Sequence, residues 1–203
     1  MIGFISAEEM MESAEKCAPY RNFIGTIINY NEERATVVTD LFDKATLKAY
    51  AKKNCNIKPT KEEAKLFSDY KGGGQGDYST IMDLKINHVV EALTEFPKSK
   101  RAVIMTNNNR WNHRDTDQAK CCRELHFYLE PTTKRDIPGR YGYKLSCTGI
   151  FRAQAVDIMP KNFYFTYYVM DLIKKKLQKS LEPHIELGNY THFVTTLVPT
   201  RND

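Results

Sequence analysis

The sequence lacks the cysteine pairs, apolar spans and leader segment that mark several large classes of protein. Its five cysteines are an odd number and no two form a Cys-x-x-Cys pair, so we expect neither a disulfide framework nor a structural zinc site. No run approaches the roughly 18 uncharged apolar residues that span a bilayer. Glu8 and Glu9 fall where a signal peptide would be apolar. We therefore expect a cytoplasmic protein with no membrane partner.

Two further absences narrow the ligands that the chain can bind. The five histidines show no metal-ligand spacing, so we expect no metal. Four glycines within residues 72–76 lack the Gly-Lys-Ser/Thr of a Walker phosphate loop, which leaves either a plain loop or a loop that covers a ligand. The net charge is +5 and the pI is about 8.8. That balance suits an anionic ligand without requiring a polyanion.

The length of 203 residues predicts one domain, residues 1–203, with a core that needs no disulfides. Helical and strand periodicities alternate along the chain, which indicates an α+β fold. We expect helices over residues 1–20, 81–96 and 163–177, shorter helical pieces within residues 43–68, and strands over residues 23–30, 35–41, 101–106, 124–130, 143–155 and 190–198.

Cys121 is a candidate nucleophile. It opens a predicted strand beside Cys122 and has Lys120, Arg123 and Arg114 nearby in the sequence. Neighbouring cations lower a thiol pKa and so increase the thiolate that attacks carbon. The alternative is that both cysteines are small core residues.

Three cations and two histidines lie at or within apolar strands. Lys100 and Arg101 precede one strand and Arg152 interrupts another. A buried cation must be paired, and a guanidinium group matches either phosphate oxygens or an internal carboxylate. His126 and His192 lie between apolar residues, and we interpret both as hydrogen-bonded core histidines.

Several segments, taken in chain order, resemble the thymidylate synthase superfamily. Together they cover roughly residues 81–195. The segments are 83–104, containing Pro-Lys-Ser-Lys-Arg; 121–129, Cys-Cys-Arg-Glu-Leu-His-Phe-Tyr-Leu; 144–153, containing Leu-Ser-Cys and Phe-Arg-Ala; 160–162, Pro-Lys-Asn; and 188–192, Gly-Asn-Tyr-Thr-His.

The resemblance implies a thymidylate-synthase-like mixed sheet flanked by helices, and a one-carbon transferase. Cys121 falls on the nucleophile that adds to C6 of a pyrimidine nucleotide monophosphate, so that C5 can attack the one-carbon unit of 5,10-methylenetetrahydrofolate. Arg152 falls on a phosphate-binding arginine. Arg101, with Lys100, matches a pair that reaches the phosphate bound by the partner in a homodimer. Asn162 falls on the amide that reads the uracil edge.

The chain departs from the family pattern in ways that leave the reaction open. Neither the catalytic glutamate helix nor the Asp-x-His-x-Tyr that holds the ribose is evident. The product could be methyl or hydroxymethyl. One alternative is a relative that modifies pyrimidines in DNA, in which case DNA is a partner. Another is a catalytically inactive nucleotide-binding dimer. For any dimer, the aromatic residues 163–168 are the expected buried surface.

Overall fold

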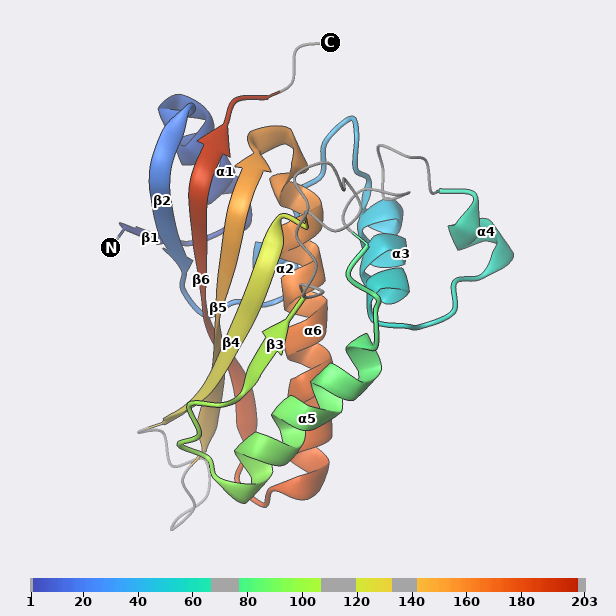
Figure 1. Cartoon of the computed structure of the whole chain (residues 1–203), viewed down its shortest axis with the longest axis vertical. Helices are drawn as coiled ribbons and strands as arrows, with labels where there is room; N and C mark the ends of the chain where they lie inside the picture. The colour runs from blue at the N-terminus through green and yellow to red at the C-terminus, as the bar shows by residue number, and fades with distance from the viewer. Residues whose placement is uncertain (1, 67–76, 107–119, 133–141, 201–203) are drawn as a thin grey trace.

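A six-stranded mixed sheet organises the part of the chain that the structure describes. The computed structural model describes residues 2–66, 77–106, 120–132 and 142–200 (Figure 1). The strands are β1 (Ile2–Phe4), β2 (Tyr20–Ile27), β3 (Val103–Met105), β4 (Cys122–Pro131), β5 (Tyr143–Ala155) and β6 (Ile185–Val198). The helices are α1 (Ala7–Cys17), α2 (Glu32–Ala35), α3 (Lys44–Asn54), α4 (Lys61–Ala64), α5 (Met82–Glu95), the 3-10 turn η1 (Val156–Ile158) and α6 (Met159–Ser180).

The strand order in the sheet is β1-β2-β6-β5-β4-β3. The pairs β1–β2 and β5–β6 are parallel, and the other neighbours are antiparallel. Parallel neighbours need a long crossover, which a helix usually provides. Here α6 follows β5 through η1 and leads to β6. The helix carries the chain back to the end of the sheet at which β5 began, so β6 can run parallel to β5.

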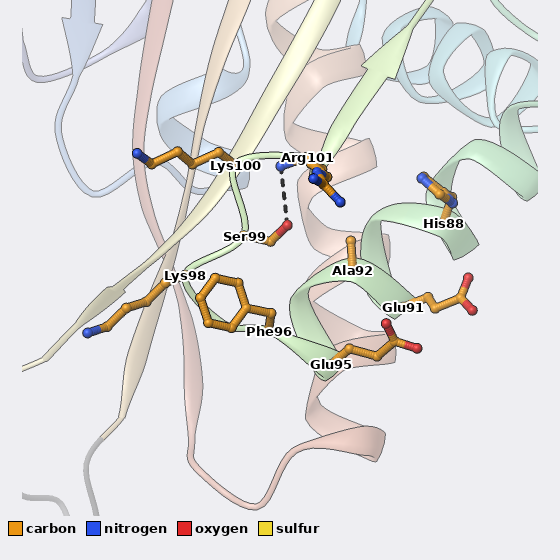
Figure 2. Close-up of a pocket in the computed structure, with 9 residues that line it drawn as sticks. All are labelled: His88, Glu91, Ala92, Glu95, Phe96, Lys98, Ser99, Lys100 and Arg101. Carbon is orange, nitrogen blue, oxygen red and sulfur yellow. Dashed lines mark hydrogen bonds between the residues drawn. The ribbon is translucent and has the colours of Figure 1, made fainter.

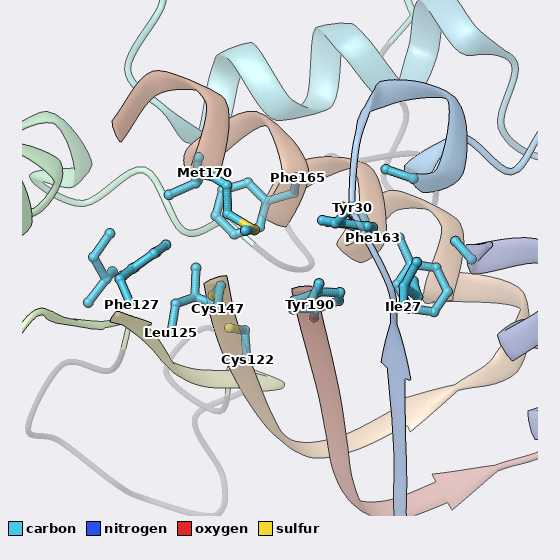
Figure 3. Close-up of a cluster of buried hydrophobic side chains, with 14 of the residues drawn as sticks. Ile27, Tyr30, Cys122, Leu125, Phe127, Cys147, Phe163, Phe165, Met170 and Tyr190 are labelled. Carbon is cyan, nitrogen blue, oxygen red and sulfur yellow. Dashed lines mark hydrogen bonds between the residues drawn. The ribbon is translucent and has the colours of Figure 1, made fainter. Parts of the chain in front are cut away.

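Helix α6 covers one face of the sheet and provides most of the core above it. Apolar side chains from β4 and β5 meet aromatic residues of α6 (Figure 3). Helices α3 and α5 both pack against α6, and α5 also contacts β3 and β4 (Figure 1). Since α6 is buried from both sides, its sequence is apolar around much of its circumference rather than along one stripe.

The opposite face of the sheet keeps contact with solvent along β4. Leu125, Phe127 and Leu129 are buried, whereas His126 and Tyr128 alternate with them and are partly exposed. Alternation with a period of two is typical of an antiparallel strand that has one covered face. In the described residues, no helix is long and apolar enough to cross a lipid bilayer.

The α+β class expected from the sequence is confirmed, and most of the expected elements are present. Residues 35–41 are an exception, because they do not form a strand. The Asn31 side chain accepts a hydrogen bond from the Arg34 backbone N–H at 2.9 Å and caps the short helix α2, which ends at Ala35. The place beside β2 is taken by β1 instead.

The aromatic segment 163–168 was expected to be the buried surface of a dimer. The structure contradicts this for residues 163–166, which lie in the core, whereas Tyr167 and Tyr168 are partly exposed. Phe163 and Phe165 are completely buried within the chain, and Tyr164 is 2 % exposed. The Phe165 ring packs between helices α6 and α3, at 6.4 Å from the Tyr50 ring. These side chains already belong to the core, so they cannot also be the surface of contact with another chain.

Candidate functional site

Cys121 lies immediately before β4, at the end of the sheet where β5 finishes. Its carbonyl oxygen accepts a hydrogen bond from the Arg152 backbone N–H at 2.8 Å. The two residues are 31 positions apart in the sequence, and the β4–β5 pairing brings them together. Arg152 is exposed rather than buried, so its guanidinium group can reach an anion in solvent.

Burial separates the five thiols into two groups. Cys55, Cys122 and Cys147 are buried, whereas Cys121 is partly exposed and Cys17 is exposed. Burial raises the pKa of the Cys55 thiol to about 12, and it also raises the pKa values of Cys122 and Cys147. A buried thiol with a raised pKa is a poor nucleophile. Cys121 is therefore the accessible thiol at this end of the sheet.

Two buried tyrosines support the first residues of β4. The Cys122 backbone N–H donates a hydrogen bond to the Tyr78 hydroxyl at 3.2 Å. The Tyr78 ring stacks on Phe165 of α6, with ring centroids 5.3 Å apart. Burial raises the pKa of Tyr50 and of Tyr78, and the thiols of Cys122 and Cys121 nearby raise both further. Both phenols therefore stay protonated.

Asn162 lies in the first turn of α6, at the same end of the sheet as Cys121. Helix α6 begins directly after β5 and η1, which fixes this position. Asn162 is 2 % exposed, and its Oδ1 has no hydrogen-bond partner among the described residues. A buried amide oxygen without a donor is rare in native proteins. The same atom is closed off from solvent.

Two charged residues near Cys121 were not singled out from the sequence. The buried Lys161 places its Nζ over the Tyr50 ring, 5.1 Å from the centroid. Asp77 precedes Tyr78. Burial opposes ionisation of Asp77, but hydrogen bonds from the Ser79 hydroxyl and backbone hold its pKa below the usual range. No local pattern predicts either residue, since Lys161 is a single cation within an aromatic helix.

Arg101 and Lys100 lie far from Cys121 in the same chain. Ala102 accepts a hydrogen bond from the Phe127 backbone N–H, so this segment lies beside the middle of β4. The six residues from Cys121 to Phe127 correspond to about 20 Å of extended strand. Both cations line an open hollow of about 660 Å³ between the end of α5 and the loop that follows it (Figure 2).

Expectations for the histidines had mixed outcomes. His192 is completely buried, as expected. His126 was expected in the core, but its side chain is 43 % exposed and lies 3.4 Å from Glu124. His126 and Glu124 project from the solvent-exposed face of β4, whereas the odd-numbered residues 125, 127 and 129 project from the other face and are buried. In the described ranges, no group of three His, Cys, Asp or Glu side chains could hold a metal ion.

Some expected features lie outside the described residues, namely the glycine-rich segment 72–76 and Arg114 in the polar segment 107–119. The structure therefore places Cys121 beside Arg152, with Asn162 at the same end of the sheet, and it separates them from Arg101 and Lys100. No family model and no curated protein matches the chain.

Proposed function

We propose that this chain is a thymidylate-synthase-like transferase that adds a one-carbon unit, methyl or hydroxymethyl, to C5 of a uracil-type nucleotide. The observation that supports the proposal best is the accessible thiol of Cys121 beside Arg152, at the end of the sheet where the Asn162 amide oxygen has no partner among the described residues. The proposal rests otherwise on the resemblance in sequence. A reducing compartment such as the cytoplasm suits a free thiol nucleophile.

In this proposal, the Cys121 thiolate adds to C6 of the pyrimidine, and the electron pair of the C5–C6 double bond moves toward C5 and the O4 carbonyl. C5 then becomes a carbon nucleophile. The Arg152 guanidinium binds the nucleotide phosphate, because its fork of donors matches phosphate oxygens. Asn162 accepts a hydrogen bond from the ring N3–H. 5,10-Methylenetetrahydrofolate is the second substrate: C5 forms a bond to its methylene carbon and the bond from that carbon to the folate nitrogen breaks. C5 then loses its proton and the Cys121 thiolate leaves C6, with water adding to the new carbon in a hydroxymethyl product or a hydride from the tetrahydrofolate in a methyl product.

The experiment measures tritium released from C5 of labelled dUMP in the presence of methylenetetrahydrofolate. We expect release with the wild-type protein and with Cys17→Ser, and none with Cys121→Ser. Cys17 is a matched control, since it is an accessible thiol at the end of α1. Folded protein that releases no tritium from any pyrimidine nucleotide contradicts the proposal. Release only from DNA favours the alternative of DNA base modification.

A thiol-labelling experiment tests nucleotide binding without requiring turnover. In the native protein, an alkylating reagent should modify Cys121 and Cys17 well before the three buried thiols. Saturating dUMP should protect Cys121 and leave the rate at Cys17 unchanged. If dUMP protects neither thiol, then Cys121 does not lie in a nucleotide site. A catalytically inactive nucleotide-binding dimer would show protection without tritium release.

The separation of Arg101 from Cys121 makes a homodimer part of the proposal. An arginine side chain cannot span about 20 Å of strand, so Arg101 could contribute to a site like that of Cys121 only in another copy of the chain. Mixing Cys121→Ser with Arg101→Ala tests this, because exchange of chains would create one intact site in a mixed dimer. Two inactive proteins that stay inactive after exchange contradict the shared site.

A further inference from the structure

The face of the sheet that points away from α6 exposes apolar side chains from several strands. Helix α1 contacts α6 and lies on the same side of the sheet, since a Cβ at Gly25 of β2 would lie 2.9 Å from the Met10 side chain. Successive residues of a strand point to opposite faces, so Ile24 and Thr26 project from the other face. Ile24 is 40 % exposed there.

Strand pairing aligns the residues of this open face in straight rows across the sheet. The threonine row has one residue from each strand, namely Gly3, Thr26, Thr191, Thr148, His126 and Val103. The apolar row lies two residues along each strand and consists of Ile24, Phe193, Ile150, Glu124 and Met105. The two rows are therefore about 7 Å apart.

The two rows differ in height. Thr26 and Thr191 are only 6 % and 7 % exposed, and their hydroxyls lie 2.9 Å apart and hydrogen-bond to each other. The apolar row stands higher, since Ile24 and Met105 are 40 % and 56 % exposed and its central residues are partly exposed. The face thus has a ridge beside a groove. The paired threonine hydroxyls can be covered without leaving a buried polar group unpaired.

We propose that this open face binds a second copy of the chain, with the apolar row of each copy lying in the threonine row of the other. A two-fold axis that runs parallel to the rows and midway between them exchanges the rows and keeps each strand over its own counterpart. Ile150 then meets Thr148 of the second copy, and the carboxylate of Glu124 meets the His126 imidazole of the second copy. A two-fold interface requires this kind of self-complementary surface.

The charge and size of the face favour a second copy over a nucleic acid. The two rows contain no Lys or Arg, and Glu124 and His126 are their only titratable residues, whereas a nucleic acid needs cations opposite its phosphates. The strands β2, β6, β5 and β4 have a footprint of about 500 Å². The relief of the side chains and the two edge strands bring the accessible area to the order of the 800 Å² per partner of a stable interface.

The same two-fold axis relates the two separated parts of the candidate site. Along β3, the chain comes from Arg101 through Val103 in the threonine row to Met105 in the apolar row. Along β4, Cys121 lies beyond Glu124, on the other side of both rows. Exchange of the rows therefore brings Arg101 of one copy to the side where Cys121 of the second copy lies. The interface does not depend on the proposed function, but a shared site at this place does.

The test measures the dissociation constant of the dimer by sedimentation over a dilution series. Ile150→Glu places a charge from each copy in the interface, so we expect the dissociation constant to rise by more than about 100-fold. Leu84→Glu is the matched control, because Leu84 is 58 % exposed on α5, which packs on the other face of the sheet. It should leave the dissociation constant unchanged.

Ile150→Thr is a milder variant in case Ile150→Glu does not fold. It keeps a β-branched side chain and lowers the ridge, so the dimer should be about 10-fold weaker. A monomeric wild-type protein, or a dimer that neither variant at Ile150 weakens, overturns the proposal. So does a monomer that binds a single-stranded oligonucleotide through Ile150. A dimer that releases no tritium from any nucleotide contradicts the proposed function and leaves the interface intact.

Discussion

His192 should make the protein less stable as the pH falls below about 6.5, the usual pKa of a free histidine. The ring is completely buried, with the Phe151 and Phe163 rings 4.5 and 5.0 Å away. Its nitrogens contact only the Tyr190 hydroxyl and the Gln154 amide among the described residues, and neither carries a charge. Burial therefore lowers the pKa of His192 to about 3.

The sign follows from proton binding in the two states. Above about pH 6.5, neither the folded nor the unfolded state protonates this ring, and the stability is unaffected. Between about pH 6.5 and 3, only the unfolded state binds the proton, so the free energy of unfolding falls by about 1.4 kcal/mol per pH unit. Going from about pH 7 to about pH 5, the loss due to His192 is about 2 kcal/mol.

Urea unfolding at these two pH values measures the effect. His192→Gln replaces the ring with an amide that can donate and accept but does not titrate. We expect the variant to lose about 2 kcal/mol less than the wild type between the two pH values. His184→Gln, at an exposed histidine, should follow the wild type. If His192→Gln loses as much as the wild type, His192 is not held neutral by burial.

Two further substitutions test contacts around the candidate site. A Cβ at Gly149 would lie 2.7 Å from the hydroxyl of Tyr190, which is completely buried, so Gly149→Ala should lower the free energy of unfolding by about 1–3 kcal/mol. Gly3→Ala is the control and should leave the free energy of unfolding unchanged, because a Cβ at Gly3 would have nothing within 4 Å. Equal effects of the two substitutions would contradict the close approach at Gly149. Tyr78→Phe leaves the buried Cys122 N–H without its acceptor and should cost about 1–3 kcal/mol in urea unfolding. No change would show that this N–H has another acceptor.

The sequence predicts an element well where one local pattern determines it. The helix expected over residues 81–96 is α5, Met82–Glu95, and its repeating residues Met82, Ile86 and Val89 are buried. The strand expected over 143–155 has those bounds in the structure. In both cases the spacing of the apolar residues predicts which face of the helix or strand is buried.

The edge strand β1 was not predicted, whereas the other edge strand, β3, lies within the strand expected over residues 101–106. Residues 35–41 have the composition of a strand but no neighbour to pair with, whereas β1 has three residues and pairs with β2. A three-residue segment carries almost no periodic pattern. Only the order of the whole sheet decides which segment occupies the edge.

The candidate site was predictable in part. The motif order placed Cys121, Arg152 and Asn162 in one site, and the structure places the first two in contact and the third at the same end of the sheet. The sequence could not show that Arg152 would be exposed, since charged residues within an apolar strand can face either side. Nor could it place Arg101 relative to Cys121, because that distance depends on the register between β3 and β4.

Gln154 shows why a polar residue within an apolar strand is ambiguous before its partners are known. Its hydrogen-bond partner His192 is 38 positions away, and the parallel pairing of β5 with β6 through α6 brings them together. Gln154 uses Oε1 as a hydrogen-bond partner of His192, and its Nε2 has no partner among the described residues. Neither fact could be read from the sequence, because both depend on how the two strands align in the sheet.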